Sequence, residues 1–200
     1  MPENTTPTPS RPAAPRSPFV IDLRELGRRA GSMRTYRRRV PAPAALGLDL
    51  IGVPEGAPLD LDLQLESVTE GVLVTGAARA PVGGQCGRCL EPVSDEVDVT
   101  FRELFAYPNS ATDATTEQDE IRRIDGELLD VEPAVRDAVV LGLPWPPLCR
   151  PDCAGLCPQC GQRLDELPPG HARDTIDPRW AALAAYTDTD SITDTTIEGD

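Results

Sequence analysis

The chain contains no lysine and a single histidine, so several common catalytic arrangements cannot be built from it. One histidine rules out an HExxH zinc motif, which needs two, and no serine lies in a G-x-S-x-G elbow. A P-loop and a GxGxxG motif are also missing from the sequence. His171 itself follows Pro-Pro-Gly and is expected in a solvated loop. We therefore expect a protein that is not an enzyme and has no small-molecule substrate.

Aromatic residues are scarce, at 4%, whereas there are 22 prolines, so the hydrophobic core must be modest. A bound metal would compensate, because the free energy of metal binding becomes free energy of folding. No run approaches 18 apolar residues, so no membrane-spanning helix is expected. The first ten residues are polar and lack the apolar region of a secretory signal. These absences predict a cytoplasmic protein, whose thiols stay reduced and favour metal over disulfides.

Charge is distributed unevenly along the chain. The net charge is −14, yet residues 1–40 hold nine arginines against three acidic residues, for +6, which leaves −20 for the rest. The exclusive use of arginine fits either a GC-rich coding sequence or selection for bidentate phosphate contacts. Residues 34–40 contain Arg34, Arg37, Arg38 and Arg39 and predict an exposed strand. These arginines have two interpretations. They form a patch that contacts RNA or another partner, or their charge protects an exposed edge strand.

Alternation of apolar and polar residues is the clearest structural signal. Residues 59–66 alternate at every position, which is typical of a half-buried strand, and residues 71–80 and 93–105 predict two further strands. A short strand is expected at 47–52, an ordered stretch at 19–26, a loop at 107–120, and helices at 133–142 and 177–186. The predicted fold class is therefore α+β, an antiparallel β-meander with few short helices and a zinc-ribbon-like cysteine staple. Tails are expected at 1–17 and 187–200.

Six cysteines form the most specific pattern in the chain. They read Cys86-x-x-Cys89 and then, after 59 residues, Cys149-x3-Cys153-x3-Cys157-x-x-Cys160. Two distant C-x-x-C pairs are typical of a tetrahedral structural zinc site, so we predict a zinc ion bound by Cys86, Cys89, Cys157 and Cys160. Cys149 and Cys153 are alternates that either replace one pair or form a disulfide on oxidation. Residues 149–160 alone also offer four thiolates.

Several segments resemble the YceD-like family, the large ribosomal RNA subunit accumulation proteins. They are Phe19-Val-Ile-Asp-Leu-Arg-Glu-Leu26, Cys86-Gly-Arg-Cys-Leu-Glu-Pro92, Leu143-Pro-Trp-Pro-Pro-Leu-Cys149, Cys153-Ala-Gly-Leu-Cys-Pro-Gln-Cys-Gly161 and Ile176-Asp-Pro-Arg-Trp-Ala-Ala-Leu183. The resemblance covers residues 18–186, and the alanine- and arginine-rich composition is similar to that of actinobacterial members. It implies a non-enzymatic factor in ribosome biogenesis that supports accumulation or processing of large-subunit ribosomal RNA. Its expected partner is the RNA precursor or a ribosomal protein.

A different class of function is also compatible with these residues. A redox- or zinc-responsive regulatory module would act through protein partners, without touching RNA, by oxidation of Cys149 and Cys153. The two hypotheses differ in whether zinc is released reversibly on oxidation.

Overall fold

The computed structural model describes residues 17–115, 117, 121–169, 171 and 179. The chain divides into two units, Met1–Pro151 and Asp152–Asp200. The tail expected at 187–200 lies outside the described residues, as do the first 16 residues and, apart from Arg179, the helix expected at 177–186.

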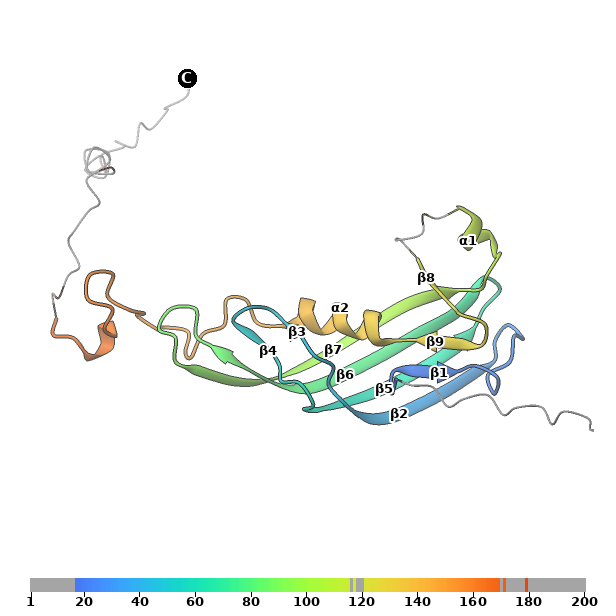
Figure 1. Ribbon diagram of the computed structural model, residues 1–200, viewed down its shortest axis with the longest axis horizontal. Coiled ribbons are helices and arrows are strands. Elements are labelled where there is room, and N and C mark those ends of the chain that lie inside the picture. Colours follow the sequence, from blue (N-terminus) through green and yellow to red (C-terminus); the bar gives the residue numbers. More distant parts are fainter. Residues whose placement is uncertain (1–16, 116, 118–120, 170, 172–178, 180–200) are drawn as a thin grey trace, which may run out of the picture. The chain divides into compact units, whose positions relative to one another are not determined.

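A seven-stranded sheet forms most of the first unit (Figure 1). Its strands are β2 (Met33–Pro41), β3 (Leu46–Gly47), β4 (Ile51–Val53), β5 (Pro58–Ser67), β6 (Gly71–Gln85), β7 (Pro92–Ala106) and β8 (Arg122–Arg123). The order β2-β5-β6 continues to β7 on the other side of β6. Strand β4 pairs with the end of β6 that β5 does not reach, and β3 pairs with β4. Every pairing is antiparallel except that of β8 with β7. The predicted antiparallel sheet with few helices is therefore confirmed.

The three predicted strands of the meander are β5, β6 and β7, and β6 and β7 are longer than their alternation indicates. Leu59, Leu61, Leu63 and Leu65 are all buried, while the residues between them are at least partly exposed. The short strand expected at 47–52 is instead a hairpin of β3 and β4, closed by a hydrogen bond from the Leu48 N–H to the Ile51 carbonyl at 2.8 Å. Two glycines at its centre, Gly47 and Gly52, allow the backbones to approach closely, since a Cβ on either would lie under 3.0 Å from the other strand.

One helix and a small second sheet cover the apolar face of these strands. Helix α2 (Glu132–Gly142), which was expected at 133–142, has Pro133 in its first turn and lies along the sheet (Figure 1). It buries Val135 and Val139. Strands β1 (Val20–Asp22) and β9 (Leu128–Asp130) pair antiparallel and place Ile21 and Leu129 in the same hydrophobic core. The modest core expected from the composition thus lies between one sheet face and this thin layer.

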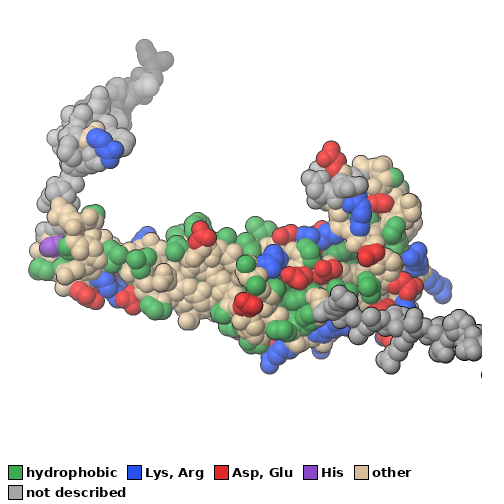
Figure 2. Space-filling model, viewed as in Figure 1, with side chains coloured by type: hydrophobic (Ala, Val, Ile, Leu, Met, Phe, Trp, Pro, Cys, Tyr) green, Lys and Arg blue, Asp and Glu red, His purple; other side chains and the backbone are tan. Residues whose placement is uncertain are grey.

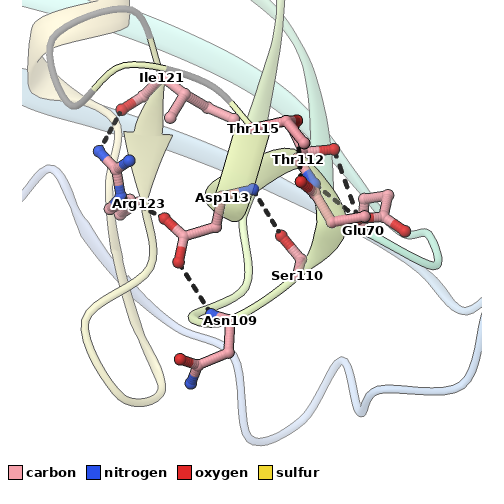
Figure 3. Close-up of polar contacts among 9 residues, drawn as sticks. Glu70, Asn109, Ser110, Thr112, Asp113, Thr115, Ile121 and Arg123 are labelled. Atoms are coloured by element: carbon pink, nitrogen blue, oxygen red, sulfur yellow. Dashed lines mark hydrogen bonds and ion pairs between the residues drawn. The ribbon is translucent and has the colours of Figure 1, made fainter.

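Part of the predicted loop at 107–120 is a short helix, α1 (Ala111–Thr115), held by side-chain hydrogen bonds (Figure 3). The Ser110 hydroxyl accepts a hydrogen bond from the Asp113 N–H at 3.1 Å. The Asp113 carboxylate accepts from the Asn109 N–H at 2.9 Å and from Arg123 Nε at 2.5 Å, and these contacts hold the pKa of Asp113 below its usual value. The segment is acidic and polar, which indicated a loop; capping contacts between residues close in sequence make it helical instead.

The second unit has little regular structure in its described residues. It contains a bridge between Leu156 and Arg163 and one turn of 3₁₀ helix, η1 (Leu164–Glu166). Across the described residues of both units, no helix is long and apolar enough to cross a membrane.

Candidate metal centres

The first cysteine pair lies in the turn that joins β6 to β7. The hairpin closes with two backbone hydrogen bonds: the Cys86 N–H donates to the Glu91 carbonyl at 2.8 Å, and the Leu90 N–H donates to the Cys86 carbonyl at 2.9 Å. The Arg88 N–H points at Cys86 Sγ at 3.5 Å. We call this arrangement a cysteine knuckle: two cysteines at C-x-x-C spacing in a turn whose N–H groups face a sulfur. The pair thus lies between the strands predicted at 71–80 and 93–105, which form one antiparallel hairpin.

A third thiol of the first unit lies beside this pair. Cys149 Sγ lies 3.6 Å from Cys89 Sγ, and the sulfurs of Cys86, Cys89 and Cys149 all lie within 4.8 Å of one another. The segment before Cys149 is held against the knuckle by a hydrogen bond from the Gly87 N–H to the Pro147 carbonyl at 2.8 Å. Tetrahedral zinc with bonds of about 2.3 Å to sulfur separates two thiolates by roughly 3.8 Å. The three thiols are therefore spaced as zinc ligands are.

The environment of Cys86 favours its thiolate. Burial by itself raises the pKa of this thiol, but N–H groups of Cys149, Arg88 and Cys89 face the sulfur and outweigh that effect, giving a pKa of about 6 instead of 9.0. Cys86 and Cys89 are buried, whereas Cys149 is exposed. A thiol that is deprotonated near neutral pH has no proton to lose when a metal binds.

A second knuckle lies in the second unit and has the same backbone hydrogen bonds. The Cys157 N–H donates to the Gln162 carbonyl at 2.7 Å, and the Gly161 N–H donates to the Cys157 carbonyl at 2.8 Å. N–H groups of Cys160 and Gln159 lower the pKa of Cys157 against the effect of burial. His171 Nε2 lies 3.4 Å from Cys160 Sγ, and Cys157, Cys160 and His171 present three ligand atoms within 4.8 Å.

The predicted zinc ligands are thus divided between the two units. Cys86 and Cys89 meet Cys149, which was an alternate, whereas Cys157 and Cys160 meet His171, which was expected to be a solvated loop residue. Sequence reasoning missed His171 because its neighbours Pro-Pro-Gly are those of a loop. The signal available was its position 11 residues after Cys160 as the only histidine of the chain. Cys153, the other alternate, is buried and is the second residue of the second unit.

The four arginines predicted as a contact patch do not share one face of β2. Arg37 and Arg39 lie on the outer face of the sheet and pair with Asp62 and Asp60 of β5 at 3.0 and 2.6 Å. Arg34 pairs with Glu25 at 3.2 Å. Arg38 donates a hydrogen bond to the Pro18 carbonyl at 3.3 Å and lies over the Tyr36 ring. Each of the four arginines therefore has an intramolecular partner.

Charges of opposite sign continue across the outer face. Arg39, Asp60, Arg79 and Asp98 occupy one register row over β2, β5, β6 and β7, and neighbours along the row form ion pairs between Arg39 and Asp60 and between Arg79 and Asp98. Arg79 also lies 3.4 Å from Glu96. At the end of the sheet that carries α1 and β8, acidic and basic side chains are likewise interspersed (Figure 2). In both places the sheet surface carries charges of both signs. Phosphate binding favours a surface with positive charge alone.

Comparison with known proteins places this α+β chain, with its cysteine knuckles, in a family. The family model described as large ribosomal RNA subunit accumulation protein YceD matches residues 74–185, which include all six cysteines and leave out β2. The chain belongs to the YceD family.

Relatives of the chain occur in mycobacteria. Uncharacterized proteins of Mycobacterium bovis and Mycobacterium tuberculosis are 55% identical over 177 residues, which span 88% of this chain and 84% of each relative. An uncharacterized protein of Mycobacterium leprae is 47% identical over 167 residues, which span 84% of this chain and 76% of the relative. The expected resemblance to an actinobacterial member agrees with these matches. No solved structure matches the chain.

Proposed function

We propose that this protein is a non-enzymatic factor in ribosome biogenesis that supports accumulation of the large-subunit ribosomal RNA in the cytoplasm. Membership of the YceD family, whose description names large ribosomal RNA subunit accumulation, is the observation that carries the proposal. The outer-face carboxylates Asp60, Asp62 and Asp98 are engaged by arginines, which makes them poor candidates for general acid–base catalysis.

A structural zinc ion stabilises the first unit in this proposal. Cys86, Cys89 and Cys149 supply three thiolates, and Cys153, four residues after Cys149 in the chain, supplies the fourth. Four thiolates fill the coordination sphere of zinc and leave no position for water, so such a site is structural. The metal would fix the β6–β7 hairpin to the segment that follows α2, where the apolar core ends.

A basic ribosomal protein is the contact that the charges favour. The chain carries a net charge of −14, and its β2 arginines have carboxylate, carbonyl or ring partners of their own. Complementary charge speeds association and selects partners. Crosslinking in growing cells, followed by purification of this protein, is expected to recover ribosomal proteins from the large subunit. Recovery of precursor RNA crosslinked at β2, without such proteins, would contradict this choice of partner.

Depletion of the protein tests the function itself. We expect sedimentation profiles of depleted cells to show less mature large subunit relative to small subunit, together with accumulated precursor of the large-subunit RNA. The wild-type gene and the Ser94→Ala variant, an exposed change in the same hairpin, should restore the profile. Cys86→Ser/Cys89→Ser should not. A normal profile in depleted cells would refute the proposal.

A redox- or zinc-responsive regulatory role is the second candidate. It is favoured by the exposure of Cys149 and Cys160, one thiol in each cluster, because oxidants reach exposed thiolates first. It requires that mild oxidation releases zinc and that reduction restores binding. A thiol count before and after chelation, with and without oxidant, measures both steps.

A further inference from the structure

The two knuckles of this chain are built alike but have different third ligands. In each, the first cysteine N–H donates to the carbonyl five residues later, and the N–H four residues later returns to the carbonyl of that first cysteine. The residue at that fourth position has a positive φ in both: 63° at Leu90 and 72° at Gly161. The third ligand atom is the Cys149 sulfur in the first unit and the His171 imidazole in the second.

We propose that the second unit binds a zinc ion of its own through Cys157, Cys160 and His171, separate from the all-cysteine site of the proposed function. The chain would therefore hold two zinc ions, whereas two C-x-x-C pairs in a sequence suggest one. This inference goes beyond the ribosomal role and does not depend on it.

The donor atoms fit zinc in kind and in spacing. Thiolate and neutral imidazole are the usual ligands of zinc in proteins, at about 2.3 Å and 2.0 Å, and tetrahedral geometry then separates sulfur from nitrogen by roughly 3.5 Å. Cys160 Sγ and His171 Nε2 are 3.4 Å apart. A simple hydrogen bond between these two side chains would also give that distance, but such a bond does not require a third ligand atom nearby. The Cys157 sulfur nevertheless lies within 4.8 Å of both atoms.

Three protein ligands leave the fourth position of this zinc to an exchangeable group. Sites with three protein ligands keep one coordination position for water or another small ligand. Cys157 is buried, but Cys160 is exposed and His171 is partly exposed, so solvent reaches one side of the cluster. In the isolated protein the fourth ligand is therefore water, and this zinc should leave before that of the four-thiolate site when a chelator is added.

Zinc content of the full-length protein tests the proposal. We expect two zinc ions per chain in the wild type and one in Cys157→Ser/Cys160→Ser. His171→Ala should weaken binding at the second site by at least about tenfold, since loss of an outer partner of a metal ligand already costs about 10- to 100-fold. Glu166→Gln, an exposed change in the same unit, should retain both ions. Titration with a chromogenic chelator should release one ion quickly and the other slowly.

Spectroscopy separates a true ligand from a neighbouring hydrogen bond. Cobalt bound to the Cys86→Ser/Cys89→Ser variant should show tetrahedral d–d bands with weaker thiolate charge-transfer intensity than cobalt in the first site. Because His171 is the only histidine, its imidazole is the only one that long-range ¹⁵N–¹H spectra can show. With zinc, these spectra should show Nε2 without a proton, and removal of zinc should change them.

Three results would overturn the proposal. One zinc per wild-type chain that is lost when either knuckle is changed would show a single shared site. An unchanged zinc content in Cys157→Ser/Cys160→Ser would show that the second knuckle binds none. An unchanged zinc affinity and cobalt spectrum in His171→Ala would show that His171 is not a metal ligand. None of these outcomes bears on the sedimentation profile of depleted cells, so this proposal and the ribosomal one can fail separately.

Discussion

In each knuckle, one residue adopts a left-handed backbone conformation in the turn that brings the two sulfurs together. Gly161 has a φ of 72°, which glycine adopts easily because it lacks a Cβ. A Cβ at this position would meet no atom within 4 Å, so the backbone conformation is the reason for glycine here. Leu90 takes a φ of 63° at the corresponding place in the first knuckle, although its side chain is 54% exposed. For a residue with a Cβ this conformation costs about 1–2 kcal/mol.

Leu90→Gly should therefore stabilise the zinc-loaded protein slightly. Relief of about 1–2 kcal/mol is offset by about 0.4–1 kcal/mol of extra chain entropy in the unfolded state, so the net gain lies between about 0 and about 1.6 kcal/mol. Chemical denaturation measures it. The reciprocal change, Gly161→Ala, should weaken zinc binding at the second site by about tenfold, which corresponds to about 1.4 kcal/mol. A loss of stability in Leu90→Gly would show that its exposed side chain packs against something essential.

At the scale of elements, the long hairpin of β6 and β7 organises the first unit. Its inner face is tightly packed where Gly76 lies under Phe101: a Cβ on Gly76 would lie 2.4 Å from the ring and 2.8 Å from Leu63. Further along the same strand, Gly83 has nothing within 4 Å of the corresponding position. The two glycines have different reasons to be there, because only the first makes room for a neighbouring side chain.

Gly76→Ala should destabilise the first unit by about 1–3 kcal/mol, the usual cost of overpacking a well-filled core. Gly83→Ala is the matched control in β6 and should change stability little, or raise it by up to about 0.5–1 kcal/mol, since glycine weakens a strand interior. Denaturant unfolding of both variants, each with zinc, gives the comparison. Equal effects would mean that Phe101 moves aside without cost.

At the scale of the whole molecule, the zinc site that we propose would make stability depend on pH. Zinc competes with protons for thiolates, and the pKa of Cys86 is about 6 in the folded chain against 9.0 for an ordinary thiol. A lowered pKa means that the thiolate is already present at pH 7 and that its contribution to stability is lost as the pH falls through about 6.

We therefore expect zinc binding at the first site to be nearly constant from pH 8 to pH 7 and to weaken progressively below about pH 6, where protons compete for the Cys86 thiolate. Equilibrium dialysis over a pH series, with zinc analysis of the Cys157→Ser/Cys160→Ser variant, reports this site alone. Loss of the ion already at pH 7 would show that the N–H groups around Cys86 do not hold its thiolate in solution.

Local patterns in the sequence determined several parts of this protein. The alternation over Leu59–Leu65 predicted β5, Pro133 at the first helical position predicted the start of α2, and the C-x-x-C spacing predicted paired thiols. These elements are settled by residues within a few positions of one another. Asp113 and Ser110 show the limit of such reasoning, because their capping contacts were hidden in a composition typical of loops.

Only the tertiary structure decided which distant groups meet. Cys149 reaches the first knuckle because the chain returns along α2 and is held at Gly87, a path that the spacing of 59 residues does not encode. The register of β2, β5 and β6 likewise places Arg39 beside Asp60 and Asp60 beside Arg79, so the basic strand faces carboxylates of its own chain. The sequence determined the kinds of ligand and charge that this protein has, because those are properties of single residues. Their partners were decided by packing, because strand register and chain path depend on contacts spread over the whole fold.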